Sequence, residues 1–303
     1  MSLYLKYRPQ TLEEIVGNPE VTQALEGMLS TPDSCPHVFL LHGPTGCGKT
    51  TIGRIIASRL GCKGSDFREV DSADFRGIDT VREIRKQSQF KPLEGPCRVW
   101  LIDECHKMTN DAQNALLKIL EDTPKHIYFV LCTTESHKLL KTILGRCSQF
   151  AVKPLNDNQM FRLLRRVVKE EGQSLPKIIY EQIAQDSFGH PRNALQILDQ
   201  VLRVEEDQRL EVAKRSAEEQ SESIELCRAL IKGDSWKGIS GILNGLKDQD
   251  PEGIRRHLLG YAQSVLLRGG DDTAARIIEE LYEPLFNIGF AGLVYACYSI
   301  TKN

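Results

Sequence analysis

The sequence lacks any long uninterrupted apolar run. No early stretch has the length of a secretory signal peptide, and none approaches the roughly 20 residues that a membrane-spanning helix needs. The sequence also has no large excess of charge of one sign, since the formal net charge is -2 and the pI is near 6.4. A globally basic nucleic-acid binder is thereby excluded, although a local basic stripe is not. We expect a cytoplasmic protein with no membrane partner.

Paired cysteines are missing as well. The nine cysteines of this 303-residue chain include no C-x-x-C pair, and several fall within apolar runs of strand type. Such scatter is atypical of a disulfide framework and of a zinc site, both of which need cysteines at regular spacing. We expect reduced cysteines that pack in the core, and no zinc.

What the sequence does contain is a phosphate-binding loop of the form G-x-x-x-x-G-K-[ST]. An apolar run at 38–41 precedes it and residues with helical apolar spacing at 52–60 follow it. Its glycines let successive N–H groups face phosphate oxygens. We expect Lys49 to reach the β- and γ-phosphates and Thr50 to ligate magnesium. The loop residues expected to bind nucleotide are Gly43, Pro44, Gly46, Cys47, Gly48, Lys49, Thr50 and Thr51.

Two carboxylates end the apolar strand predicted at 98–104. Asp103 is expected to help hold magnesium, and Glu104 to orient or deprotonate the attacking water. Further strands are predicted at 38–41, 67–71, 127–132 and 148–152, and helices at 19–29, 52–60, 78–90 and 109–122, with Asn18 as the N-cap of the first. This alternation indicates a parallel sheet with helices on both faces. Ligands then lie at the carboxyl ends of the strands, where Gly43, Asp103 and Thr134 fall.

The composition changes after residue 153, and no strand is predicted beyond it. Helices are predicted at 156–169, 175–188 and 191–204, and the charge-rich stretch 205–223 is either another helical segment or a linker. Helices at 224–231, 236–246, 251–267, 273–287 and 289–300 indicate a separate helical domain. The last of these is apolar on most faces, which predicts burial in a core or in a subunit interface.

The order of these motifs resembles the AAA+ clamp-loader ATPases, which include the bacterial gamma/tau subunit, the small subunits of replication factor C and phage counterparts. The resemblance runs from residue 3 to about 203, on Tyr7-Arg8-Pro9, the loop at 43–50, and the segments 71–79, 102–106, 114–118, 145–147 and 189–195. It implies an α/β AAA+ phosphate-loop domain with a parallel sheet at 1–152, a three-helix lid at 153–213 and an all-α C-terminal collar at 214–303.

Residue roles also follow from this resemblance. Arg146 matches the arginine finger that reaches the ATP of a neighbouring subunit, although Gly145 stands where the family has serine. Thr134 matches a polar sensor, Arg192 a lid arginine that senses the γ-phosphate, and Gln113 a glutamine that couples the ATP site to DNA. The lead-in that contains Arg8 and Val16 is expected to cover the purine.

The helix predicted at 78–90 carries a basic stripe. A stripe of this kind is either a solvated face or a contact with a nucleic-acid backbone. The resemblance implies the second, with Arg76, Arg82 and Lys86 meeting phosphates and not bases. Clamp contact is expected at the helix 19–29 or the segment 90–96.

The resemblance predicts an ATPase motor subunit of a sliding-clamp loader that uses ATP and Mg²⁺. Its partners would be other loader subunits in a pentameric ring, a sliding clamp and primer–template DNA. Only Cys62 lies between residues 60 and 67, where gamma/tau subunits carry a four-cysteine zinc module, which favours a phage or minimal cellular member. Two alternatives stay open: another AAA+ DNA motor of branch-migration type, and a weakly hydrolysing scaffold subunit of a ring complex.

Overall fold

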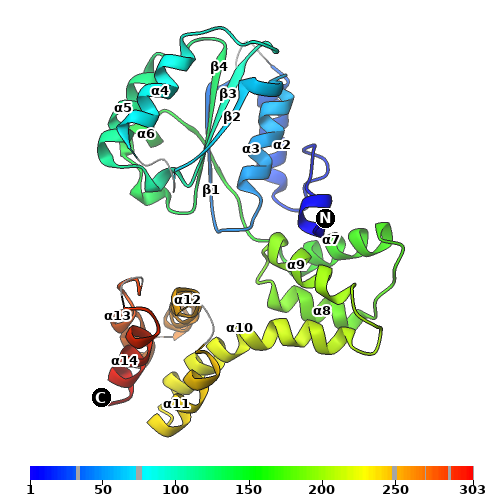
Figure 1. Cartoon of the computed structure of the whole chain (residues 1–303), viewed down its shortest axis with the longest axis vertical. Helices are drawn as coiled ribbons and strands as arrows, with labels where there is room; N and C mark the ends of the chain where they lie inside the picture. The colour runs from blue at the N-terminus through cyan, green and yellow to red at the C-terminus, as the bar shows by residue number, and fades with distance from the viewer. Residues whose placement is uncertain (32–34, 73–76, 248–250, 270, 286–287, 303) are drawn as a thin grey trace. The chain divides into compact units, whose positions relative to one another are not determined.

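A computed structural model describes residues 1–31, 35–72, 77–247, 251–269, 271–285 and 288–302 (Figure 1). The chain divides into two compact units, Met1–Val204 and Glu205–Asn303. No helix among the described residues is both long and apolar enough to cross a membrane. The predicted domain limits at 152 and 213 stay predictions, and residue 213 lies within a continuous helix of the second unit.

A five-stranded parallel sheet is the centre of the first unit. Its strands are β1 (Val38–His42), β2 (Phe67–Asp71), β3 (Arg98–Asp103), β4 (Ile127–Thr133) and β5 (Ser148–Ala151), in the order β2-β3-β4-β1-β5. Strands β1, β3 and β4 are almost continuously buried, as expected when helices cover both faces of a parallel sheet. His42 pairs with Thr133 and Asp71 with Asp103, so the strands end along one edge.

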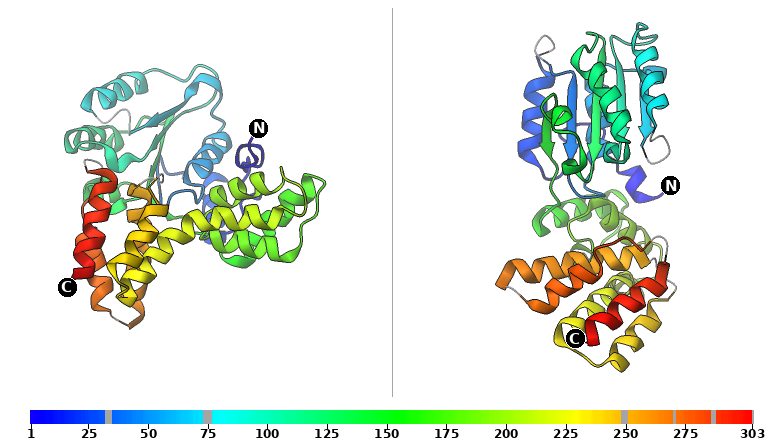
Figure 2. Two further views of the ribbon diagram at one scale, coloured as in Figure 1. Left: turned by 60° about the horizontal axis from the view of Figure 1, so that its bottom comes forward. Right: turned by 90° about the vertical axis from the view of Figure 1, so that its left-hand side faces the viewer.

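Helices cover the two faces of this sheet (Figures 1 and 2). They are α2 (Pro19–Leu29) and α3 (Lys49–Arg59) on one face, and α4 (Ile78–Ser88), α5 (Asn110–Glu121) and the short α6 (Lys141–Leu144) on the other. Helix α3 lies close to the sheet at Gly53, where a Cβ atom would come within 2.7 Å of the Leu101 side chain. The absence of a side chain at Gly53 permits this close packing. The start of α3 is thereby fixed at the strand edge.

Asn18 occupies the N-cap position of α2 with Pro19 in the first turn, as predicted, but its side chain does not cap the helix. Its backbone is left-handed, with φ of 50°, and its side chain makes no cap hydrogen bond to α2. It instead accepts from the Lys153 N–H at 2.7 Å and donates to the Lys153 carbonyl at 3.0 Å. The entrance of α2 is therefore tied to the segment that leaves the sheet, a long-range contact that overrides the local preference.

Three helices follow the sheet within the first unit. They are α7 (Asp157–Glu170), α8 (Lys177–Asp186) and α9 (Pro191–Val201), and we call them the lid helices. A capping box between Asn156 and Gln159 starts α7. The N-terminal α1 (Leu3–Lys6) packs against α9. The Tyr7 hydroxyl donates to Glu171 Oε1 at 2.5 Å, so the N-terminal segment is attached to the end of α7.

The second unit is entirely helical in its described part. It contains α10 (Arg209–Lys232), α11 (Trp236–Gly245), α12 (Pro251–Gly269), α13 (Asp272–Glu280) and α14 (Gly289–Lys302). The predicted separation of 205–223 from 224–231 is wrong, since α10 is continuous; residues 209–232 contain neither glycine nor proline. Helix α13 ends earlier than predicted. Helix α14 buries Leu293 and Ile300 but leaves Tyr295 72% exposed.

Candidate functional site

The phosphate loop joins β1 to α3, as predicted. Gly43 has a φ of 144°, and a Cβ atom there would lie 2.1 Å from the Val152 carbonyl oxygen, so only glycine fits. Lys49 is 5% exposed, and its Nζ donates to the Gly43 and Pro44 carbonyls, both at 2.8 Å. The ammonium group is therefore held inside the curve of the loop.

The two residues predicted to ligate magnesium are in direct contact. Thr50 Oγ1 donates to Asp103 Oδ2 at 2.7 Å, while Asp103 Oδ1 accepts from the Glu104 N–H at 2.9 Å. A hydroxyl and a carboxylate are oxygen ligands of the kind that Mg²⁺ prefers, so the donor set fits the ion. Their role as ligands stays a prediction.

Glu104 lies beside this pair in a strained backbone conformation. Its φ of 47° is in the left-handed region, which costs free energy for a residue other than glycine and is typical of functional sites. Its Oε2 accepts from Thr134 Oγ1 at 3.1 Å. The predicted sensor residue and the predicted base residue therefore meet at the ends of β3 and β4.

A histidine without a predicted role also contacts Glu104. His106 places Nδ1 3.2 Å from Glu104 Oε2 and Nε2 3.3 Å from Glu135 Oε1. Burial lowers the pKa of the imidazole, and the two carboxylates oppose that shift only in part. The hydrogen bond of His106 Nδ1 is to Thr133 Oγ1, at 2.9 Å, so the imidazole connects the ends of β3 and β4 beside Glu104. The sequence could have indicated this position, since His106 comes three residues after Asp103, just beyond the end of the same strand.

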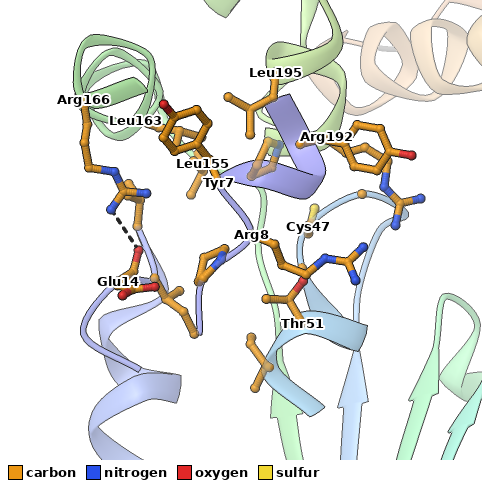
Figure 3. Close-up of a pocket in the computed structure, with 18 residues that line it drawn as sticks. Tyr7, Arg8, Glu14, Cys47, Thr51, Leu155, Leu163, Arg166, Arg192 and Leu195 are labelled. Atoms are coloured by element: carbon orange, nitrogen blue, oxygen red, sulfur yellow. Dashed lines mark hydrogen bonds between the residues drawn. The ribbon is translucent and has the colours of Figure 1, made fainter. Parts of the chain in front are cut away.

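An apolar cavity of about 100 Å³ adjoins the loop (Figure 3). Its apolar walls come from the N-terminal segment, α3 and the lid helices, through Ile15, Val16, Ile52, Leu155, Leu163 and Leu195. Residues predicted to bind nucleotide that line it are Arg8, Val16, Gly46, Cys47, Gly48, Thr51 and Arg192. Burial raises the pKa of the Cys47 thiol, so this thiol adds no negative charge near neutral pH. The cavity has the character of a site for a purine ring.

A second, polar cavity of about 200 Å³ is lined by the loop and by the carboxylates of Asp103 and Glu104. Arg8, Arg54 and Arg192 also line it, and Figure 3 shows the guanidinium groups of Arg8 and Arg192 on the same side, beside the loop. Burial lowers the pKa of Arg8, and the charges of Arg54 and Arg192 lower it further. Arg8, Lys49, Arg54 and Arg192 outnumber the carboxylates of the lining, Glu69, Asp103 and Glu104, which favours a polyanionic ligand. Arg54, for which no motif predicted a role, lies on α3 and pairs with Glu69 at 2.7 Å.

The lid helices contact the phosphate loop directly. His190 Nδ1 is hydrogen-bonded to the Thr45 carbonyl, and its residue comes just before α9. A Cβ atom at Gly46 would lie 3.6 Å from both His190 and Arg192. Movement of the lid helices therefore changes the surroundings of the loop. The motif at 189–195 contains His190 but predicted no role for it.

Arg146 lies apart from both cavities. It follows α6, forms an ion pair with Glu121 at the end of α5, and donates to the Thr142 carbonyl at 2.9 Å. Its side chain is 35% exposed. An arginine that lines neither cavity of its own chain has the placement that an arginine finger acting on a neighbour requires; that role stays a prediction.

Gln113 is 2% exposed on α5 and connects two segments of the site. Its Nε2 donates to the Met108 carbonyl at 3.3 Å, and its Oε1 accepts from the Leu140 N–H at 3.0 Å. Met108 follows the Asp103–Glu104 strand end, and Leu140 precedes the helix that leads to Arg146. The side chain thus connects two segments next to the site, and its coupling of the ATP site to DNA stays a prediction.

The residues predicted to contact DNA lie on or before α4. Arg82 and Lys86 are exposed, and Arg82 forms an ion pair with Asp79 at 2.9 Å. Arg76 lies outside the described residues. Within the described ranges no group of three or more His, Cys, Asp or Glu side chains is arranged to hold a metal ion. The expected absence of zinc stays a prediction.

The fold is shared with solved AAA+ structures. The Thermotoga maritima RuvB Holliday junction branch migration motor matches with a TM-score of 0.60 at 19% identity, covering 78% of this chain and 85% of that one. A point variant of the same motor matches with a TM-score of 0.61. At this identity the likeness concerns the fold alone. The first unit and its lid helices therefore define an AAA+ phosphate-loop protein, followed by further helices.

Sequence relatives narrow this class. A family described as "DNA polymerase III, delta subunit" matches residues 64–156. The DNA polymerase III subunit gamma/tau of Mycobacterium tuberculosis is 36% identical over 225 residues, which cover 67% of this chain and 39% of that protein. Subunit tau of Bacillus subtilis is 34% identical over 222 residues, covering 66% and 39%. The chain thus spans well under half the length of these relatives. Over the matched residues it belongs to the bacterial-type clamp-loader AAA+ family.

Proposed function

We propose that this chain is an ATPase motor subunit of a sliding-clamp loader. ATP binding opens the clamp and grips primer–template DNA, and hydrolysis releases the closed clamp for processive replication. One observation carries the proposal: the loop and both carboxylates line one polar cavity, Thr134 is hydrogen-bonded to Glu104 beside it, and Arg146 lies outside it. Such a site is completed by a neighbouring subunit.

The geometry supports a division of labour within the ATPase site. Lys49 and the loop amides bind the phosphates, and Arg192 meets the γ-phosphate from the lid. Thr50 and Asp103 would hold magnesium, which would neutralise part of the phosphate charge when bound. Glu104, oriented by its hydrogen bond from Thr134, accepts the proton of the attacking water. Arg146 of an adjacent subunit stabilises the charge that develops during transfer.

The partners follow from the same proposal. Other loader subunits complete a pentameric ring through the second unit, where the 72% exposed Tyr295 on α14 fits a subunit interface. The site of action is the cytoplasm, or the host cytoplasm if the chain is encoded by a phage. No zinc is required.

Clamp contact is best supported at the segment after α4. Phe90 is 62% exposed and Leu93 is 76% exposed, which is unusual for two large apolar side chains three residues apart. The other candidate, α2, buries Val21, Leu25 and Leu29 in the core of the first unit. Its apolar face is therefore already used, and we assign clamp contact to the segment 90–96.

DNA contact is proposed on α4, and charge reversal tests it. In the assembled ATP-bound complex, Arg82→Glu with Lys86→Glu should weaken binding to duplex DNA of any sequence. The slope of log affinity against log salt should fall by about 2, because each lost phosphate contact removes about 0.9. Anisotropy titrations at several salt concentrations measure this slope. Lys63→Glu, an exposed lysine before β2, is the matched control; a double variant with the slope of this control would refute the placement.

Clamp loading itself is the test of the function. The chain is combined with a clamp and partner subunits, and clamp retained on primed circular DNA is counted with ATP, without nucleotide and with a non-hydrolysable analogue. We expect retention that requires ATP, and release of the closed clamp that requires hydrolysis. Branch migration, the alternative raised by the likeness to RuvB, predicts movement along duplex DNA with no clamp present. A scaffold subunit predicts unchanged loading when the ATPase site is disabled.

A further inference from the structure

A stripe of unpaired positive charge runs along the outer face of α7. Arg162, Arg165 and Lys169 are exposed and follow the i, i+3, i+7 spacing that places residues on one helix face. None of the three forms a salt bridge with any described residue. By contrast Arg203, an exposed arginine just after α9, is paired with Asp199 at 3.1 Å. The stripe is therefore an uncompensated charge in a chain whose net charge is -2.

Two adjoining grooves are built on this stripe. One, of about 380 Å³, is lined by Arg165, Lys169, Lys177 and Tyr180, and the other, of about 580 Å³, by Phe161, Arg162, Arg165, Lys177 and Glu181. Arg165 and Lys177 belong to both. The nucleotide cavity uses a different face of α7, through Leu163 and Arg166. The grooves are thus a separate feature of the lid helices.

Aromatic rings accompany the charges in these grooves. The Arg165 guanidinium lies over the Tyr180 ring, 5.9 Å from its centroid, and Phe161 is partly exposed beside Arg162. Glu181, the acidic residue in the groove lining, forms a salt bridge with Lys177 at 3.0 Å. Positive side chains next to aromatic rings are the combination that binds single nucleic-acid strands, through phosphates and stacked bases.

We propose that these grooves bind the phosphate backbone of a single nucleic-acid strand. From Arg162 to Lys169 the stripe extends about 10 Å along the helix. The stripe therefore presents three cations along one helix face, to which successive phosphates of one strand can bind. An acidic protein segment is the less favoured ligand, because its carboxylates have no regular spacing to match the stripe, whereas the phosphates of a nucleic-acid strand do. The inference rests on the proposed function for the source of the strand.

Neutralising the stripe tests this site. The full chain carrying Arg162→Ala, Arg165→Ala and Lys169→Ala is titrated with a fluorescent single-stranded oligothymidine between 50 and 200 mM salt. Each lost phosphate contact removes about 0.7 from the slope of log affinity against log salt, so the slope should fall by about 2. Over that range the parent chain should then lose about 16-fold more affinity than the variant. Arg203→Ala is the matched lid control, and thermal melting verifies folding.

The possible outcomes separate the site from the proposed function. A triple variant with the salt slope of Arg203→Ala overturns the site. So does tighter binding of polyglutamate than of the oligonucleotide, lost in the same variant, which would assign the grooves to an acidic protein. If no clamp is loaded but the triple variant still differs from its control, the proposed function fails and the lid site stands. If the clamp is loaded normally but the triple variant has the salt slope of its control, the proposed function stands and the lid site fails.

Discussion

Replacing Lys49 with alanine is expected to abolish ATP-dependent clamp loading and to lower ATP hydrolysis by a factor of roughly 10² to 10³, the usual cost of removing one preorganised electrostatic group. Lys49 Nζ is buried, and it is held by two carbonyls at the curve of the loop. Its charge is therefore already placed where the β- and γ-phosphates would lie. Steady-state hydrolysis and retention of clamp on primed circles measure the two losses.

The control for this substitution has to separate lost charge from a disturbed loop. Lys63→Ala removes an exposed lysine of the same unit and should leave both activities intact. Because Lys49 also braces Gly43 and Pro44, the melting temperature of Lys49→Ala is measured alongside. Full clamp loading by a folded Lys49→Ala protein would contradict the assignment of the chain as a motor subunit.

Replacing Arg146 with alanine is expected to leave ATP binding intact while lowering hydrolysis in the assembled ring by roughly 10³ or more, the magnitude of an arginine finger. The reason is geometric: Arg146 lines neither cavity of its own chain, so it has no part in binding that chain's nucleotide. Binding of a fluorescent ATP analogue and turnover by the ring are the two measurements. Lys141→Ala, an exposed lysine on α6, is the matched control.

The isolated chain tests whether Arg146 acts only on the nucleotide of a neighbouring subunit. A verified monomer should bind ATP yet hydrolyse it slowly, and Arg146→Ala should not change that slow rate. Fast hydrolysis by the monomer, or a large effect of the substitution on the monomer, would contradict the prediction that Arg146 acts on the nucleotide of a neighbouring subunit. The ion pair with Glu121 is partly exposed, so its cost to releasing the finger is about 1 kcal/mol or less.

The local sequence predicted the elements of the first unit well. The phosphate loop, the strand ending in Asp103 and the helix that starts at Pro19 all carry strong short-range signals, and the structure has them at or near the predicted limits. Thr50 and Asp103 were also paired correctly, because parallel strands end at one edge of a sheet. These features depend on patterns of a few neighbouring residues.

The remaining features depend on contacts between distant residues. Asn18 gives up its cap for Lys153, His106 meets Glu135, and His190 meets Thr45, and no periodicity in the sequence encodes such pairs. Of the two alternatives for 205–223, the helical segment is confirmed, but its continuity with the next predicted helix was not predicted. Residues 209–232 contain no glycine or proline that would end a helix.

Helix α5 has a consequence for the thermodynamics of the complex. It packs against α4, which carries the proposed DNA contacts, and through Gln113 and Glu121 it holds the segments on either side of the ATPase site. A displacement of α5 by DNA is thus a displacement of the groups that respond to ATP. Linkage then requires reciprocity: the factor by which DNA tightens ATP binding equals the factor by which ATP tightens DNA binding. A single coupling free energy would then describe both effects.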